Sequence, residues 1–505
     1  MSPLTLDWIR QQGEIFSESI AREYYLSGSG QKPTADLQGI YARHAEVIGS
    51  DALGLTLDAF RSEPRDSEEW RQVRRLLDWL ADAQSARELA PLEEREIAWE
   101  GEAVVRLEDD RRIQFQQVAI EIGNSTDQRE RHAIEAARNR LVSAELAPIR
   151  LEHFQREHDI VKALDLAPDY NAAFELLSGI SLGELRAQCE QFLKDTQALW
   201  DDLMPEFTRR VLGIDPATAT RADALALFRA RDFDRYFSPD AMEREISRQV
   251  REMGVDPRAN GRIVFDTGDR PGKRSRAFCS AVRVPDEVYL VLRPHGCQTD
   301  WNTFMHELGH SLHFAYMRPD LPFEYRWLGD NSITEGYAML FDHLMQDPGW
   351  LARYTELSGG AVQAFLRSAG FEELQFLRRY CAKLVYEIEL HGANANWSAL
   401  PDLYVERLTG ATNFRYDPSD AFVDVDPRYY AARYLRAWQL QALITETLVE
   451  RYDADWWRNP RAGPWIVASL FGEGQRELAQ EQAQRVAGKS LSFDPLVRAI
   501  ERLVS

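Results

Sequence analysis

Amphipathic helical spacing dominates the N-terminal part of the chain. Between residues 5 and 95, apolar residues recur every three or four positions among Glu and Arg, as in SEEWRQVRRLLDWLADAQ. Such spacing places the apolar side chains on one face of a helix. The same pattern returns from about residue 125, in DQRERHAIEAARNRL and GELRAQCEQFLKDTQALWDDL. We therefore expect these regions to be helical.

Two segments interrupt this pattern with β-prone residues. In EAVVRLEDDRRIQFQQVAIEIG, two such runs flank the turn-like EDDR, which predicts a hairpin near residues 100–122. In AFCSAVRVPDEVYLVLRP, residues 277–294, two valine-rich runs are joined by PDE. The second of these runs is too continuously apolar for a half-exposed strand, so it indicates a buried strand in a small sheet.

The chain is too long, at 505 residues, for one ordinary hydrophobic core. The stretch GVDPRANGR, residues 254–262, is rich in residues that interrupt helices and strands, and it indicates a boundary between two parts of the chain. We expect a mostly helical N-terminal half, residues 1–255, and a C-terminal half, residues 256–505, that carries the chemistry. Because the segment after Asp300 is again helical in pattern, the predicted fold class is mainly α with one small sheet.

The amino-acid composition indicates which broad class of protein the chain belongs to. Apolar residues make up 44% of the chain and charged residues 28%, which is typical of a soluble globular protein. The net charge of −21 argues against nucleic acid and anionic membranes as partners, because binding them needs basic patches. The four cysteines form no CxxC pair, no secretory signal is visible, and no stretch is apolar enough to span a membrane. We therefore expect a cytoplasmic protein.

Three of the ten histidines lie within the eleven residues FMHELGHSLHF. We expect a helix over residues 301–317, because Asp300 is a favourable N-cap and Pro319 cannot continue a helix. Three apolar residues form a stripe that would bury this helix: Phe304, Leu308 and Leu312. The histidines lie on the face next to that stripe.

His306 and His310 are four residues apart, so both imidazoles project from one face of the helix. Two neutral imidazoles held in this way can chelate zinc, and Glu307 lies where it can act as a base toward the activated water. This is the HExxH order of ligand, base, two spacers and ligand. His313 shares the face, but a straight helix does not easily bring three imidazoles into tetrahedral geometry.

Glu335 is the best candidate for a third metal ligand. It lies 25 residues after His310, which leaves room for a loop and a returning antiparallel helix. In the alternative interpretation, Ser332 and Glu335 form a capping box, and Glu335 bonds the backbone. Asp342 lies two turns further on, where it either holds a histidine N–H or is an ordinary surface acid.

HELGHSLH, followed by Glu335, resembles the gluzincin metallopeptidases of the thimet oligopeptidase and oligoendopeptidase F family. CSAVRVPDEVYLVL resembles the edge strand of that family, and RYYAARYLRAW, residues 428–438, resembles its tyrosine-bearing segment. The resemblance implies a bowl-like helical body with a deep channel. It also implies one zinc ion per chain, bound by His306, His310 and Glu335, and short peptides as substrates.

The resemblance further implies that Glu307 is the catalytic base and that a tyrosine stabilises the oxyanion. The candidates are Tyr429, Tyr430 and Tyr434, and Tyr434 matches the last tyrosine of the family best. Aromatic packing against Trp438 is the alternative for each. The histidine that often precedes this segment in the family is missing from DAFVDVDPRYY.

The predicted function is a zinc-dependent endopeptidase that cleaves internal bonds of short peptides. Two alternatives stay open: a metallocarboxypeptidase, for which Arg428 or Arg433 would bind the substrate carboxylate, and a non-catalytic helical peptide-binding protein. Glu307 argues against the latter, because a structural zinc site is more often closed by four protein ligands. The backbone of Ala281–Val284 either pairs with a peptide as an added strand or lies inside the sheet. The sequence leaves the oligomeric state undetermined.

Overall fold

The computed structural model describes residues 4–505 and divides them into two compact units. The first unit contains the residues up to Gln84, together with Arg231–Gly370 and Arg433–Ser505, and the second contains Ser85–Ala230 and Phe371–Ala432. Each unit is thus assembled from stretches that are far apart in the sequence. Residue 255 lies inside the first unit, and separate folding of the two predicted halves stays a prediction.

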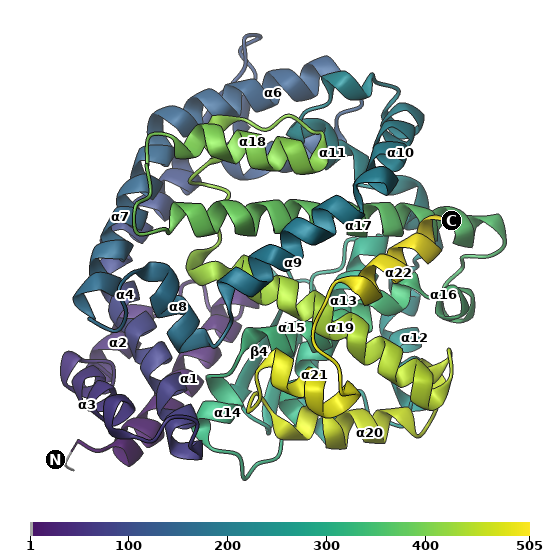
Figure 1. Cartoon of the computed structure of the whole chain (residues 1–505). Coiled ribbons are helices and arrows are strands. Elements are labelled where there is room, and N and C mark those ends of the chain that lie inside the picture. The colour runs from purple at the N-terminus through teal and green to yellow at the C-terminus, as the bar shows by residue number, and fades with distance from the viewer. Residues whose placement is uncertain (1–3) are drawn as a thin grey trace. The chain divides into compact units, whose positions relative to one another are not determined.

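The first unit is mainly helical and carries a small sheet (Figure 1). Its elements are α1 (Leu6–Gly28), α2 (Leu37–Arg43), α3 (Ser50–Ser62), α12 (Pro239–Glu252), β3 (Ile263–Asp266), β4 (Phe278–Arg283), β5 (Glu287–Val291), α13 (Gln298–Tyr316), α14 (Phe323–Trp327), α15 (Asn331–Asp342), α16 (Pro348–Tyr354), α20 (Ala462–Ser469), α21 (Ala479–Ala487) and α22 (Asp494–Val504).

The second unit is also mainly helical. Its elements are β1 (Val104–Arg106), β2 (Arg112–Gln114), α5 (Val118–Asn124), α6 (Gln128–Leu141), α7 (Ala147–Ala163), α8 (Tyr170–Ser178), α9 (Leu182–Asp195), α10 (Gln197–Phe207), α11 (Arg221–Leu227) and α18 (Leu400–Thr412). Three long helices have residues in both units: α4 (Glu68–Glu102), α17 (Gly360–Leu390) and α19 (Tyr430–Tyr452). The predicted mainly α fold class is confirmed.

The small sheet has the strand order β3-β5-β4. β5 runs parallel to β3 and antiparallel to β4, with Ser280 opposite Tyr289. The central place of β5 explains why its sequence is apolar on both faces. β4 is an edge strand, which excludes the interpretation of Ala281–Val284 as an internal strand. β3 was not expected, because a run of four residues carries too little pattern to predict a strand.

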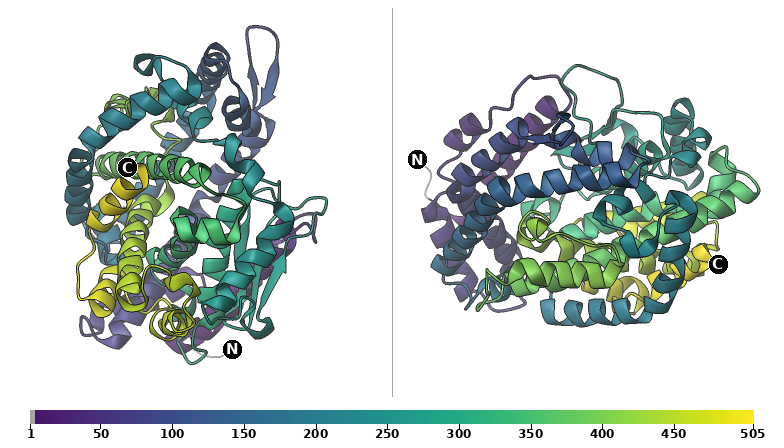
Figure 2. Two further views of the ribbon diagram at one scale, coloured as in Figure 1. Left: turned by 90° about the vertical axis from the view of Figure 1, so that its right-hand side faces the viewer. Right: turned by 90° about the horizontal axis from the view of Figure 1, so that it is seen from above.

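The predicted hairpin near residues 100–122 is present but shorter. Val105 pairs with Ile113 in an antiparallel ladder of three residues per strand, and the hairpin stands out from the neighbouring helices at the upper right of the left-hand view in Figure 2. The run after Gln114, expected to continue the second strand, instead forms a 3₁₀ turn and α5. Its apolar residues Val118 and Ile122 are four apart and share one buried helical face.

The histidine-bearing helix α13 begins three residues before the predicted start. Its N-cap is Cys297, and Asp300 lies in the first turn. The Asp300 carboxylate accepts hydrogen bonds from the backbone N–H groups of His295 at 2.6 Å and Gly296 at 2.7 Å. The predicted N-cap role of Asp300 is therefore wrong, although its carboxylate still stabilises this end of the helix.

The apolar stripe on α13 forms part of the main core of the first unit. Phe304, Leu308 and Leu312 are fully buried and belong to the same hydrophobic cluster as Tyr337 of α15 and Leu440 of α19. Burying each such side chain contributes about 1.5–3 kcal/mol. Figure 1 shows α13, α15 and α19 close together around this core. The packing fixes α13 and therefore the direction of its histidines.

Gly309, the glycine of HELGH, marks the closest approach of α13 to α15. A Cβ atom built at this position would lie 2.6 Å from the Cα of Ala338 and 2.6 Å from the carbonyl oxygen of Tyr337. Both contacts are with backbone, which cannot move without separating the helices. The glycine thus allows the two helices that carry the candidate ligands to pack backbone against backbone.

We expect Gly309→Ala to destabilise the first unit. Overpacking of this kind costs about 1–3 kcal/mol, which outweighs the gain of about 1 kcal/mol in helix propensity. Denaturant unfolding measures the effect. Gly54→Ala is the matched control, because Gly54 lies in α3 of the same unit, and apart from its own neighbouring backbone no atom of residues 4–505 lies within 4 Å of its built Cβ. Equal midpoints for the two variants would contradict the close-packing argument.

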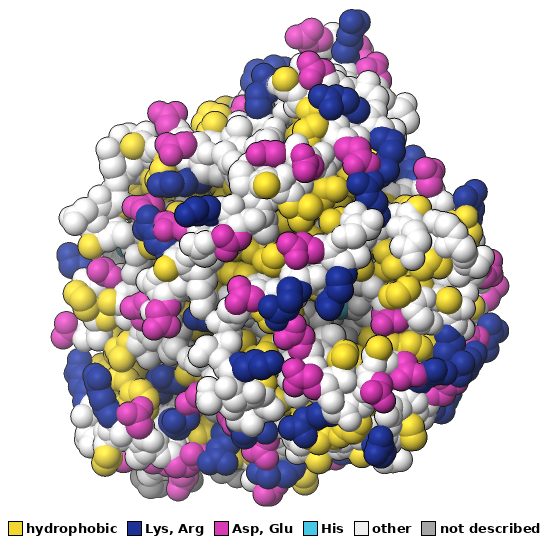
Figure 3. Space-filling view, turned by 45° about the vertical axis from the view of Figure 1, so that its right-hand side comes forward, with side chains coloured by type: hydrophobic (Ala, Val, Ile, Leu, Met, Phe, Trp, Pro, Cys, Tyr) yellow, Lys and Arg dark blue, Asp and Glu magenta, His cyan; other side chains and the backbone are white. Residues whose placement is uncertain are grey.

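Acidic and basic side chains lie interspersed on the face of the molecule shown in Figure 3. Among residues 4–505, none of the helices combines the length and the apolar character needed to cross a lipid bilayer.

Candidate metal centre

Two helices of the first unit bring three ligand-type side chains together. His306 and His310 project from α13, and Glu335 projects from α15. Glu335 Oε2 lies 3.4 Å from His306 Nε2 and 3.7 Å from His310 Nε2. One ligand atom from each of the three residues lies within 4.8 Å of the other two. Two imidazole nitrogens and one carboxylate oxygen at this spacing fit a divalent metal ion.

The alternative role of Glu335 in a capping box is not observed. The N-cap of α15 is Asp330, whose carboxylate accepts a hydrogen bond from the backbone N–H of Ser332 at 2.9 Å. Glu335 lies inside the helix, more than one turn from its start, and turns its carboxylate toward the histidines. The tertiary packing of α15 on α13 therefore separates two interpretations that the sequence left open.

Each imidazole is oriented through its second nitrogen. His306 Nδ1 donates to Asp342 Oδ2 at 2.8 Å, and His310 Nδ1 lies 2.8 Å from Thr334 Oγ1. These contacts turn both Nε2 atoms toward Glu335. Asp342 is buried, so it is not an ordinary surface acid. Thr334 was not predicted; its only sequence signal is its position directly before Glu335.

The charges around His306 favour a positive charge at the centre. Burial alone would lower the pKa of His306, but Asp342 and Glu335 more than offset this effect and raise it to about 10. Burial lowers the pKa of His310. Burial would also raise the pKa of Asp342, yet His343 and His306 hold it below its ordinary value. The site thus holds two carboxylates close to the imidazoles and attracts cations.

Glu307 lies on α13 directly after His306. Within residues 4–505, its carboxylate makes no hydrogen bond or ion pair, and its charge acts on His310 and on Cys279 of β4. β4 is fixed beside this turn because Ser311 Oγ lies 3.4 Å from Cys279 Sγ. Glu307 is therefore a carboxylate with open acceptor capacity beside the candidate ligands, as a general base requires.

His313, the third histidine of the motif, does not belong to the cluster. It is fully buried, and its Nε2 lies 3.3 Å from the carbonyl oxygen of Gly474. Its ring packs edge-on against Tyr337 at 4.7 Å between ring centroids. Burial lowers its pKa to about 3, so this imidazole is neutral. The structure assigns it a packing role.

The three candidate tyrosines are divided between the units. Tyr434 belongs to the first unit, is half-buried, and packs edge-on against Trp438 at 4.9 Å between ring centroids. Tyr429 and Tyr430 belong to the second unit. Tyr429 is fully buried, and its hydroxyl donates to Asn171 Oδ1 and to the carbonyl oxygen of Glu387. An oxyanion role for any of the three stays a prediction.

We expect Asp342→Asn to weaken metal binding by about 10–100-fold, because it removes the charge that holds His306 Nδ1. Titration of the metal against a competing chelator measures the effect. Asp286→Asn, at an exposed position of the same unit, is the control and should bind as the parent does. An unchanged affinity in Asp342→Asn would show that this hydrogen bond does not support the metal centre.

No protein-family model matches the chain. Among curated proteins, a segment of 156 residues is 24% identical to the chromosomal oligoendopeptidase F of Lactococcus lactis subsp. cremoris. The match covers 30% of this chain and 24% of that protein. The chain thus matches about a quarter of the length of this relative.

Solved structures match over the whole chain. The M32 carboxypeptidase from Deinococcus radiodurans R1 superposes with a TM-score of 0.61 at 15% identity and 99% coverage of both chains. The carboxypeptidase from Pyrococcus furiosus superposes with a TM-score of 0.63 at 11% identity and 100% coverage of both chains. The protein therefore has the helical fold of these carboxypeptidases. Its predicted resemblance to the oligoendopeptidase F family is confirmed by the sequence match.

Proposed function

We propose that the protein is a zinc-dependent peptidase that hydrolyses short peptides. The observation that carries this proposal is the convergence of His306, His310 and Glu335 beside Glu307. The sequence match to oligoendopeptidase F and the likeness in fold to carboxypeptidases support it. Zinc is the proposed metal because two histidines and one carboxylate are a common ligand set of catalytic zinc.

In the proposed reaction, different side chains bind the metal, orient its ligands and transfer a proton. When bound, a zinc ion supplies Lewis acidity that lowers the pKa of water and polarises a peptide carbonyl. His306, His310 and Glu335 hold it, while Asp342 and Thr334 orient the imidazoles. The Glu307 carboxylate takes the proton of the attacking water and passes it to the nitrogen of the leaving amine.

Tyr434 is the proposed donor to the oxyanion of the tetrahedral intermediate. It lies on α19, which packs against α15 next to Glu335, since a Cβ on Gly336 would meet Leu440 and the backbone of Ala437. A phenol donor of this kind is worth about 2.7–4 kcal/mol in the transition state. Tyr→Phe variants at positions 429, 430 and 434, compared by kcat, identify the donor.

The mode of cleavage has two candidates. Internal cleavage is favoured by the sequence match to oligoendopeptidase F. Removal of C-terminal residues is favoured by the whole-chain likeness in fold to carboxypeptidases. Arg433, one candidate for binding a substrate carboxylate, faces Asp78 at 3.8 Å. Of these two modes, we propose internal cleavage as the first candidate, and digestion of amidated and free-acid peptides separates them.

Digestion of a peptide set tests both the metal dependence and the mode. We expect hydrolysis to stop on chelation and to return when zinc is added. An endopeptidase cleaves a peptide with a C-terminal amide as fast as its free acid, whereas a carboxypeptidase requires the free carboxylate. Mass spectrometry of the products reads both results. Hydrolysis that persists without metal would contradict the proposal.

We further propose a cytoplasmic location, supported by four cysteines that form no disulfide in residues 4–505. They are Cys189, Cys279, Cys297 and Cys381. Unpaired thiols are typical of a reducing compartment. The absence of nucleic-acid and membrane partners stays a prediction from the net charge.

A further inference from the structure

The second unit contains a cavity whose lining residues take no part in the proposed peptidase chemistry. Three helices, α5, α11 and α17, line this cavity of about 600 Å³. This volume lies within the range of about 300–1,000 Å³ that is typical of small-molecule sites. The lining positions follow helical spacing, since Arg221, Ala224, Leu225 and Phe228 are i, i+3, i+4 and i+7 along one face.

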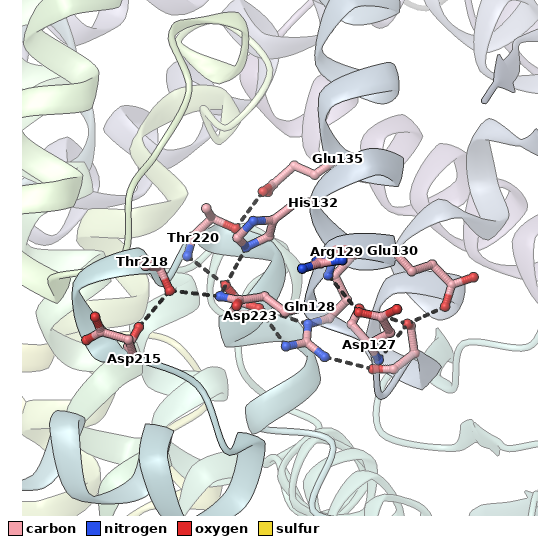
Figure 4. Close-up of polar contacts among 12 residues, drawn as sticks. Asp127, Gln128, Arg129, Glu130, His132, Glu135, Asp215, Thr218, Thr220 and Asp223 are labelled. Carbon is pink, nitrogen blue, oxygen red and sulfur yellow. Dashed lines mark hydrogen bonds and ion pairs between the residues drawn. The ribbon is translucent and has the colours of Figure 1, made fainter. Parts of the chain in front are cut away.

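A buried polar network holds α11 in place as one wall of this cavity. Figure 4 shows Asp223, on the first turn of α11, in contact with residues of α6. The Asp223 carboxylate accepts a hydrogen bond from Arg131 Nε at 2.9 Å and lies 2.7 Å from His132 Nε2. Thr220 Oγ1 donates to Glu135 Oε2 at 2.8 Å. The wall is therefore rigidly positioned before any ligand binds.

The rim and walls of the cavity are largely apolar. Ile120 of α5 is 54% exposed and Phe376 of α17 is 41% exposed, which is unusual for side chains of this size. Ala224 and Leu225 of α11 line the opposite side. These side chains can cover the apolar body of a ligand.

Two of the three arginines that line the cavity have carboxylate partners. Arg221 forms ion pairs with Asp420 and with Glu135, each at 3.8 Å. Arg379 donates to Asp424. Because these two guanidinium groups are neutralised by the protein itself, they offer little attraction to an anionic ligand.

Two acceptors on α17 have no hydrogen-bond donor among the described residues. Gln375 is 4% exposed, and no group within residues 4–505 donates a hydrogen bond to its Oε1. One turn away, the carboxyl of Glu372 makes no hydrogen bond or ion pair with any of residues 4–505. Burial and the neighbouring Glu373 raise the pKa of Glu372 to about 8. Neither Arg229 nor Arg379, which also line the cavity, contributes to that shift.

We propose that this cavity binds a small organic amine in its ammonium form. The ammonium group donates to the Glu372 carboxylate and to Gln375 Oε1, and an apolar body lies between Ala224, Leu225 and Phe376. The chemistry follows from a carboxyl without a cation and a buried acceptor without a donor, both in an apolar cavity. The site lies outside the metal centre, so the inference holds whether or not the protein is a peptidase.

Calorimetric titration of the full-length protein tests the proposal with three probes of one shape. They are 2-phenylethylammonium, 2-phenylethanol and 3-phenylpropanoate. We expect the ammonium ion to bind at least about tenfold more tightly than the other two, because only it can pair with Glu372. Equal affinities, preference for the carboxylate, or no binding of the ammonium ion at concentrations on the order of millimolar would each overturn the proposal.

Three single-residue variants test whether the ammonium ion binds in this cavity. Glu372→Gln keeps the shape of the side chain and should remove the preference for the ammonium ion, whereas Glu406→Gln, at an exposed position of α18, should keep it. Ala224→Phe fills the cavity and should abolish binding of the ammonium ion, which distinguishes this site from the metal centre. Circular dichroism confirms that each variant is folded. A preference that survives in Glu372→Gln, or binding that survives in Ala224→Phe, would refute the assignment.

Discussion

Glu307→Gln lowers kcat/KM for peptide hydrolysis by about 10²–10⁴-fold and leaves the bound metal at the level of the parent protein. The amide has almost the shape of the carboxylate but cannot accept a proton from water at neutral pH. Because His306, His310 and Glu335 are untouched, the metal centre is still assembled. A fluorogenic peptide measures the rate, and elemental analysis of the dialysed protein measures the metal.

The control for this experiment is Glu356→Gln, which removes an exposed carboxylate from the same unit. It should retain the activity of the parent. Hydrolysis at the parent rate in Glu307→Gln would refute the assignment of the base. Bound metal without hydrolysis in both the parent and Glu307→Gln would instead favour the non-catalytic peptide-binding alternative.

Glu335→Ala abolishes both metal binding and hydrolysis. Loss of an orienting group costs about 10–100-fold in metal affinity, and we expect the loss of a direct ligand to exceed that range. The two imidazoles that remain come from one helix and leave the centre with a single anchoring element. Metal content after dialysis and the rate of peptide hydrolysis measure the two losses together.

The graded variant Glu335→Gln serves as the comparison, since its amide oxygen still reaches the site without the negative charge. We expect its metal content to lie between those of the parent and Glu335→Ala. Far-ultraviolet circular dichroism should show the same helix content for all three proteins. Full metal content in Glu335→Ala would mean that the carboxylate is not a ligand, and the proposed zinc chemistry would fail with it.

The candidate ligands were largely predictable because two of them belong to one local pattern. His306 and His310 are four residues apart, so the helical repeat alone places them on one face. For Glu335 the sequence left two interpretations open, since its neighbour Ser332 also fits a capping box. Only the packing of α15 on α13 shows its carboxylate 3.4 Å from His306 Nε2.

Features that depend on contacts between distant segments were missed. Thr334 was not recognised as a partner of His310 Nδ1, because its role requires the register of α15 against α13. The N-cap is a local exception: the sequence favours Asp300 over Cys297, because a carboxylate at the third helical position also accepts backbone hydrogen bonds. The strand β3 carries too few residues to produce a pattern, and it is defined by its pairing with β5.

Local spacing along the chain was enough to predict the mainly α class, the histidine-bearing helix and the candidate metal ligands. These follow from spacings of three to seven residues, which backbone geometry converts directly into faces of a helix. The packing of the helices was needed to show which side chains orient the imidazoles, why Gly309 must be a glycine, and which segments form each unit. Those properties depend on how closely separate helices pack, and a local spacing carries no information about that distance.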